Sequence, residues 1–150
     1  MGDGNTDYQT ESRASMLDAL TGLFNHGYFH HALRQELERS QRYGTECTVA
    51  LVGLDSLGSF NRLHGYATGD KRIAETANIF SEALRQSDLA ARYEGDTLAA
   101  ILPHTDGDAA TAALDRARVE VQKTMGADAT VSIGVVEVRV GRQVAGPIMD

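Results

Sequence analysis

The sequence predicts an α+β domain in which helices pack against one sheet. Segments with helical and strand periodicity alternate in the order helix, strand, helix, strand, strand, helix, strand, and a short Gly-Asp turn joins the two middle strands. Helices on both sides of such a hairpin argue against a doubly wound parallel sheet. A chain of 150 residues is also about as long as one ordinary domain.

The first half of the chain predicts two helices and a strand. A helix runs from about Tyr28 to Arg42, and Gly44 then ends it. Its apolar positions are Phe29, Ala32, Leu33 and Leu37, and its charged positions on a separate face are Glu36, Glu38 and Arg39. The apolar run 47–53 predicts a central strand that begins at Cys47, which we expect to be a small core residue. A polar, glycine-bearing stretch, 55–70, leads into a helix over 68–85.

The second half predicts the hairpin, one more helix and a last strand. Residues 89–93 and 98–102 are short strands around Glu94-Gly95-Asp96-Thr97. A helix follows over 106–123, and Asp106 can cap it. Residues 131–136 predict a strand, and valines alternate with charged residues beyond it, at Val136, Val138 and Val140. This alternation is typical of an exposed edge, which we expect to self-associate or to contact a partner.

Composition excludes several classes of protein. The net charge is −7, from 21 acidic and 14 basic residues, which disfavours nucleic acids and anionic membranes as general partners. No apolar run approaches the roughly 20 residues that span a bilayer, so we expect no membrane insertion by this segment. Cys47 is the single cysteine, which fits a reducing cytoplasm. The polar residues 1–15 predict a flexible leader, followed by one domain over 16–150.

Five stretches come in a fixed order along the chain. They are 18–25 (DALTGLFN), 54–70 (LDSLGSFNRLHGYATGD), 85–93 (RQSDLAARY), 94–98 (EGDTL) and 131–135 (VSIGV). In order and spacing they resemble the motifs of the GGDEF family of diguanylate cyclases. The resemblance implies a cyclase-type palm fold, with a mostly antiparallel central sheet flanked by helices. The family continues into a further helix with phosphate-binding residues, which we expect to be missing from this chain.

The same resemblance implies that the residues for catalysis are lost. The family joins two GTP molecules with divalent cations, which need carboxylate ligands. Gly53 stands at the position of one metal-binding Asp and Thr97 at that of a metal-binding Glu, which leaves Asp96 as a vestigial catalytic residue. Glu94 replaces a glycine close to the nucleotide, and Leu57-Gly58 replaces a Phe-Lys pair. We therefore expect no bound metal, no cofactor and no synthesis of cyclic di-GMP.

Two groups of residues remain at ligand-binding positions of the family. Asn61 and Asp70 match residues that contact guanine, as a vestigial guanine-binding pair, but with metal and phosphate contacts depleted we prefer a structural role, Asn61 satisfying its loop and Asp70 capping a helix. Arg85 and Asp88 match the family's inhibitory site for cyclic di-GMP, and Arg116 matches an auxiliary arginine of that site. An arginine fork and a carboxylate suit the edges of guanine.

Three hypotheses follow for the function. The leading one is a non-catalytic receptor for cyclic di-GMP that uses Arg85, Asp88 and Arg116. The second is a domain that binds no nucleotide and serves dimerisation or partner docking, in which Arg85 is a helix-end cation and Asp88 a turn residue. The third is a residual cyclase.

Overall fold

The computed structural model describes residues 15–139. Apart from Ser15, the predicted leader lies outside the described residues, and so does Val140 of the predicted edge. The chain order of the elements is α2 (His26–Tyr43), β1 (Cys47–Leu54), α3 (Leu57–His64), α4 (Tyr66–Ala83), β2 (Leu89–Glu94), β3 (Thr97–Pro103), α5 (Gly107–Met125) and β4 (Val131–Val138).

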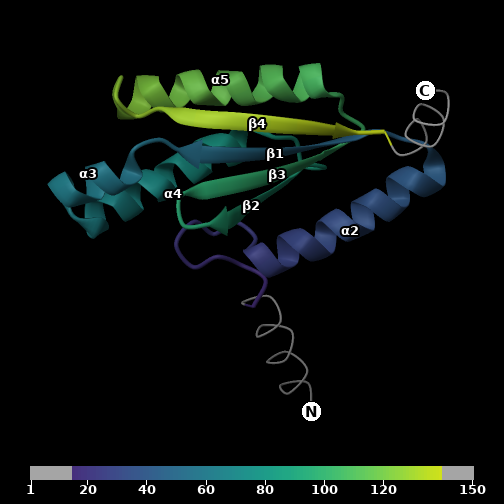
Figure 1. The fold of residues 1–150 in the computed structure, drawn as a ribbon, viewed down its shortest axis with the longest axis horizontal. Helices are drawn as coiled ribbons and strands as arrows, with labels where there is room; N and C mark the ends of the chain where they lie inside the picture. The colour runs from purple at the N-terminus through teal and green to yellow at the C-terminus, as the bar shows by residue number, and fades with distance from the viewer. Residues whose placement is uncertain (1–14, 140–150) are drawn as a thin grey trace, which may run out of the picture.

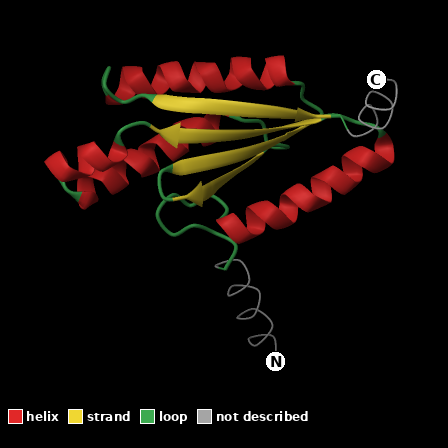
Figure 2. Cartoon of the chain, viewed as in Figure 1, coloured by secondary structure: helices red, strands yellow, loops and turns green. Residues whose placement is uncertain are grey.

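The four strands form one sheet in the order β2-β3-β1-β4 (Figure 2). Each neighbouring pair is antiparallel, and β1 lies inside the sheet between β3 and β4. The predicted α+β class, the hairpin and the central position of the first strand are therefore confirmed. The predicted edge is also present, since β4 is an outer strand and the side chain of Val136 is 64% exposed.

Helices cover the two faces of the sheet unequally (Figure 1). Helices α4 and α5 pack on one face, where Ile73, Phe80 and Leu114 belong to a core with inward residues of β1, β3 and β4. Helix α2 packs on the other face, where Phe29 meets Ala91, Ala99 and Ile101 of β2 and β3.

On the second face, the part that runs from Leu51 of β1 to β4 is uncovered by helices among the described residues, although α2 reaches Val49 of β1. Leu51 there is 41% exposed, and it pairs in register with Gly134, which is also exposed. This half-face is apolar and open.

Several local predictions are wrong. The stretch expected to be an irregular connection contains α3, an eight-residue helix that follows Ser56, whose φ is 57°. Helix α4 begins at Tyr66, with Gly65 as its N-cap, so Asp70 lies inside the helix and does not cap it. That helix ends at Ala83, which leaves Arg85 in the following turn. Glu36, predicted on the charged face of α2, is instead buried.

Other local predictions are confirmed. Gly44 ends α2 in the left-handed conformation with φ 67°, and Asp106 caps α5 by accepting a hydrogen bond from the amide of Ala109. Cys47 is fully buried, and burial raises the pKa of its thiol, with a smaller contribution from the charge of Glu36. Within residues 15–139, none of the helices combines the length and the apolar character needed to cross a membrane.

Candidate functional site

The residues of the predicted signature meet where β1 ends beside the β2–β3 turn. Gly53 pairs in register with Thr97, and the amide of Leu54 donates to the carbonyl of Asp96 over 2.9 Å. The hydroxyl of Thr97 donates to the Asp96 carboxylate over 3.3 Å. A Cβ atom at Gly53 would meet no atom within 4 Å, so the position is open and carries no side chain. The sheet thus brings Gly53, Asp96 and Thr97 together, and Asp96 alone of the three carries a carboxylate.

A carboxylate that the sequence analysis did not assign also lies at this end of the sheet. Asp55 follows β1 directly, and its Oδ1 accepts a hydrogen bond of 2.7 Å from the hydroxyl of Ser132 on β4. The signal for it was present, since Asp55 stands two residues after Gly53 in the resembling stretch 54–70. Among residues 15–139, however, no group of three or more His, Cys, Asp or Glu side chains is arranged to hold a metal ion.

The segment before α2 is tied to the signature turn by an ion pair. The guanidinium of Arg92 lies 3.3 Å from Asp18 and also donates to the carbonyl of Gly95 over 2.9 Å. Burial raises the pKa of Asp18, but hydrogen bonds from Thr21 and the charge of Arg92 outweigh it and bring the pKa below its usual value. Both residues lie in the motif stretches 18–25 and 85–93, but motif spacing does not predict this contact, which joins positions 74 residues apart.

Asn61 and Asp70 lie on two helices that approach each other closely. The side chain of Asn61 on α3 contacts Gly69 of α4, the residue before Asp70. Asn61 Oδ1 is buried and has no hydrogen-bond partner among the described residues, whereas Asp70 is exposed. The structural role predicted for Asn61, satisfying polar groups of a loop, is therefore wrong, because Asn61 lies in a helix and packs against a neighbouring helix.

Arg85 and Asp88 form one compact turn. The Asp88 carboxylate accepts from the backbone amide of Arg85 over 2.8 Å and from its guanidinium over 3.2 Å. The same guanidinium donates to the carbonyl of Pro103 over 3.1 Å and to the hydroxyl of Thr105. These contacts fix Arg85 in place while its side chain stays 58% exposed. Asp88, by contrast, has a side chain only 2% exposed.

A shallow hollow of about 280 Å³ lies against this turn, and Ser81, Leu84, Gln86 and Ala90 complete its lining. Arg116, the third predicted residue, is exposed on α5. It does not line this hollow, and no hydrogen bond or ion pair among the described residues joins it to Arg85 or Asp88. The structure thus brings Arg85 and Asp88 together but shows no contact of either with Arg116.

Comparison with known proteins gives a consistent family. Residues 15–147 match the family described as diguanylate cyclase, GGDEF domain. The chain is 30% identical over 113 residues to the diguanylate cyclase DgcP of Pseudomonas aeruginosa, covering 75% of this chain and 17% of DgcP. It is 33% identical over 95 residues to the diguanylate cyclase DgcS of Shewanella oneidensis, covering 63% of this chain and 32% of DgcS. The chain therefore spans less than a third of each of these relatives.

Solved structures agree with the fold. The coiled coil and GGDEF domain of DgcB from Caulobacter crescentus, in complex with c-di-GMP, superposes with a TM-score of 0.87 at 28% identity, covering 93% of this chain and 78% of that one. The diguanylate cyclase SiaD of Pseudomonas aeruginosa, in complex with its activator SiaC, gives a TM-score of 0.78 at 31% identity, covering 99% of this chain and 59% of SiaD.

Proposed function

The chain belongs to the GGDEF family of diguanylate cyclase domains, and from that premise we propose that it is a non-catalytic member that binds cyclic di-GMP. The proposed site is the turn of Arg85 and Asp88, with Arg116 as a third contact. One observation carries the proposal: Arg85 is held by Asp88, Pro103 and Thr105, yet more than half of its side chain faces solvent. An arginine fixed in this way loses little conformational entropy when it binds a guanine or a phosphate.

The two residues of the turn have different roles in this proposal. Arg85 presents the outward edge of its guanidinium to the ligand. The carboxylate of Asp88 is covered and already accepts hydrogen bonds from Arg85, so Asp88 acts by positioning Arg85. A direct hydrogen bond from guanine to Asp88 requires the Arg85–Asp88 pair to open first.

The loss of catalysis is the second part of the proposal. Gly53 and Thr97 supply no carboxylate where the family places metal ligands, and hard cations such as Mg²⁺ need several oxygen ligands. Asp96, Glu94, Asp55 and Asp18 are acidic residues near this end of the sheet, but the Asp55 carboxylate already accepts a hydrogen bond from Ser132 and Asp18 is paired with Arg92. Too few free carboxylates remain at this site to bind a hydrated divalent cation. Without that cation, the charge on the phosphates of two GTP molecules is not neutralised.

The relatives support this choice of ligand, and the cysteine content supports a compartment. DgcB was solved in complex with c-di-GMP, and its GGDEF domain shares the fold of this chain. A single, buried cysteine suits a reducing compartment, so we place the protein in the cytoplasm. Calorimetric titration of the full chain with cyclic di-GMP, and separately with GTP and Mg²⁺, tests the proposal. The proposal predicts a saturable heat with cyclic di-GMP. With GTP and Mg²⁺, chromatography of the mixture should show no cyclic di-GMP.

A specific observation also favours a second function, docking of another protein or a second copy. Leu51 and Val136 are exposed on the open half-face of the sheet, and no strand within residues 15–139 pairs with the outer edge of β4. SiaD, a relative with the same fold, was solved in complex with an activator protein. If cyclic di-GMP does not bind, this surface becomes the leading candidate for the function.

A further inference from the structure

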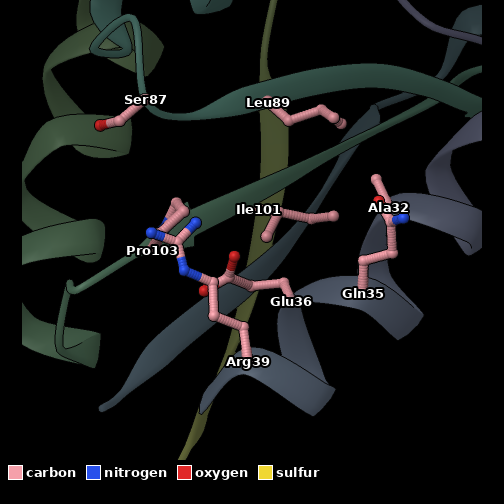
Figure 3. A pocket seen from close by; sticks show the side chains of 8 residues that line it. All are labelled: Ala32, Gln35, Glu36, Arg39, Ser87, Leu89, Ile101 and Pro103. Atoms are coloured by element: carbon pink, nitrogen blue, oxygen red, sulfur yellow. The ribbon is translucent and has the colours of Figure 1, made fainter. Parts of the chain in front are cut away.

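A second hollow, of about 340 Å³, lies between α2 and the strands β2 and β3 (Figure 3). Its volume falls at the lower end of the range for small-molecule sites, roughly 300–1,000 Å³. Leu89 and Ile101 of the strands and Ala32 of the helix give it apolar walls. Glu36 and Arg39 of the helix give it one acidic and one basic group.

Glu36 is the unusual residue of this hollow. The residue is only 8% exposed, and its Oε2 atom is buried without a hydrogen-bond partner among the described residues. Carboxylates are rarely buried unless a cation or hydrogen-bond donors replace the water that they lose. Neither is supplied to this oxygen by residues 15–139, although the side chain lines an accessible hollow. Oε2 itself is covered, so a donor in the hollow meets the Glu36 carboxylate through its other oxygen, which makes no hydrogen bond with a described residue.

Arg39 lies one helical turn further along α2 and lines the same hollow (Figure 3). It forms no ion pair with Glu36 or with any other described residue. A third hollow, of about 650 Å³, shares Arg39 and Gln35 and is lined also by Glu38, Arg42 and His104. Arg39 therefore borders both hollows without an ion pair among the described residues, and its guanidinium can bind an anionic group.

We propose that the hollow binds a small zwitterion of the α-amino acid class, with its ammonium group on Glu36 and its carboxylate on Arg39. An ammonium group supplies the donors that the buried carboxylate lacks, and a carboxylate fits the planar fork of arginine. The side chain of the ligand packs on Leu89 and Ile101, so apolar amino acids bind better than charged ones. Because such a ligand is neutral overall, the acidic net charge of the protein does not repel it.

The test is a thermal-shift screen of the full chain with each proteinogenic L-amino acid, followed by calorimetry of those that raise the melting temperature. We expect saturable binding of at least one apolar amino acid, such as leucine. For leucine, 3-methylbutylamine lacks the carboxylate and 4-methylpentanoate lacks the ammonium group, so each should bind at least about tenfold more weakly. Glu36→Gln and Arg39→Gln should each weaken leucine binding by about tenfold or more.

Matched control variants are Glu75→Gln and Arg34→Gln, which change exposed residues outside this hollow and should leave affinity unchanged. Circular dichroism of each variant verifies folding, and Arg39→Gln tests the idea even if Glu36→Gln alters the packing of α2. The proposal is overturned if no amino acid binds saturably, if the amine or the acid binds as tightly as leucine, or if both site variants keep full affinity.

The inference is independent of cyclic di-GMP binding. A chain that binds leucine but not cyclic di-GMP would remove the proposed function and leave this site standing. A chain that binds cyclic di-GMP but no amino acid would remove the amino-acid site and leave the proposed function standing.

Discussion

The side chain of Asn61 on α3 fills the space into which a Cβ atom at Gly69 of α4 would project. Gly69 is buried, and it lies in helical backbone where any residue has suitable dihedral angles. Glycine is therefore favoured at this position because of space and not because of conformation, and a larger residue fits only if the Asn61 side chain shifts. The close approach of the two helices gives Asn61 a packing role whether or not it contacts a nucleotide.

This relationship predicts a coupled pair of substitutions. Gly69→Ala should lower the free energy of unfolding by about 1–3 kcal/mol, because the added methyl group must displace Asn61. With Asn61→Ala already present, the same change should be neutral or stabilising by up to about 1 kcal/mol, because alanine favours helices over glycine. Urea unfolding of the four proteins measures the coupling. An equal loss of stability in both backgrounds would show that Asn61 is not the obstacle.

The ion pair of Asp18 and Arg92 predicts a pH-dependent stability. The folded-state pKa of Asp18 is lowered, so its contribution is complete above the unfolded value of about 3.9 and is lost as the pH falls through the folded value. Asp18→Ala should therefore cost about 1.5–3 kcal/mol near neutral pH, and this difference from the wild type should shrink below about pH 4.

Urea unfolding of both proteins across this pH range tests the point. The matched control is Asp115→Ala, which removes a more exposed ion pair with Arg118 and should cost at most about 0.5 kcal/mol. A cost for Asp18→Ala that stays constant down to pH 3, or one no larger than that of the control, would contradict the assignment.

Hydrophobic periodicity predicted the helices and strands that have a long apolar pattern. It did not predict the short helix α3 or the burial of Glu36, which depend on contacts between distant residues. The strand at 47–53 and the hairpin around Gly95-Asp96 have strong local signals, and both are present. Helix α3 has eight residues and contains Gly58, too little pattern to separate a short helix from a loop. Glu36 was misplaced because periodicity assigns charge to the outer face, whereas this carboxylate lies beneath α2.

In the candidate site, too, contacts between residues close in the sequence could be predicted and contacts between distant residues could not. Residues that are close in the sequence, such as Arg85 and Asp88, were correctly expected to lie together, because a turn joins them. The contacts of Arg85 with Pro103 and Thr105 could not be predicted, since they join positions 18 and 20 residues apart after a hairpin intervenes. Sequence motifs indicate which residues matter, but the register of β3 determines what they touch.

The signature residues predict that the chain has no cyclase activity. Incubation with GTP and either Mg²⁺ or Mn²⁺ should yield no cyclic di-GMP by chromatography, because Gly53 and Thr97 provide no metal ligands. The double variant Gly53→Asp with Thr97→Glu should also remain inactive, since Glu94 still places a negative charge at the turn. Steady product formation by the wild type would refute the loss of catalysis. Robust turnover by the double variant alone would show that Glu94 is tolerated.

The open sheet edge predicts self-association or partner contact through β4. At high protein concentration, sedimentation velocity should detect dimers that Val136→Lys weakens, because a buried lysine at such an interface costs free energy. Val119→Lys is the matched control, since Val119 is an exposed valine that belongs to α5 and not to β4. A chain that stays monomeric at every concentration, or an equal effect of both variants, would count against an interface at β4.

Variants of the Arg85 turn predict how cyclic di-GMP binds. Arg85→Ala should weaken binding by about 1–3 kcal/mol, or roughly ten- to hundredfold, because it removes the guanidinium fork. Asp88→Ala should weaken it too, by releasing Arg85 from its fixed position, and Arg116→Ala should do so if α5 contributes the third contact. Asn61→Ala is the control and should bind normally. Added salt should reduce the affinity of the wild type, since it screens the arginines from an anionic ligand.

Calorimetric titration of the wild-type chain with cyclic di-GMP tests the central proposal most directly. We expect a saturable heat that Arg85→Ala reduces sharply and Asn61→Ala leaves unchanged. No heat at high micromolar ligand, or equal binding by Arg85→Ala, would contradict it.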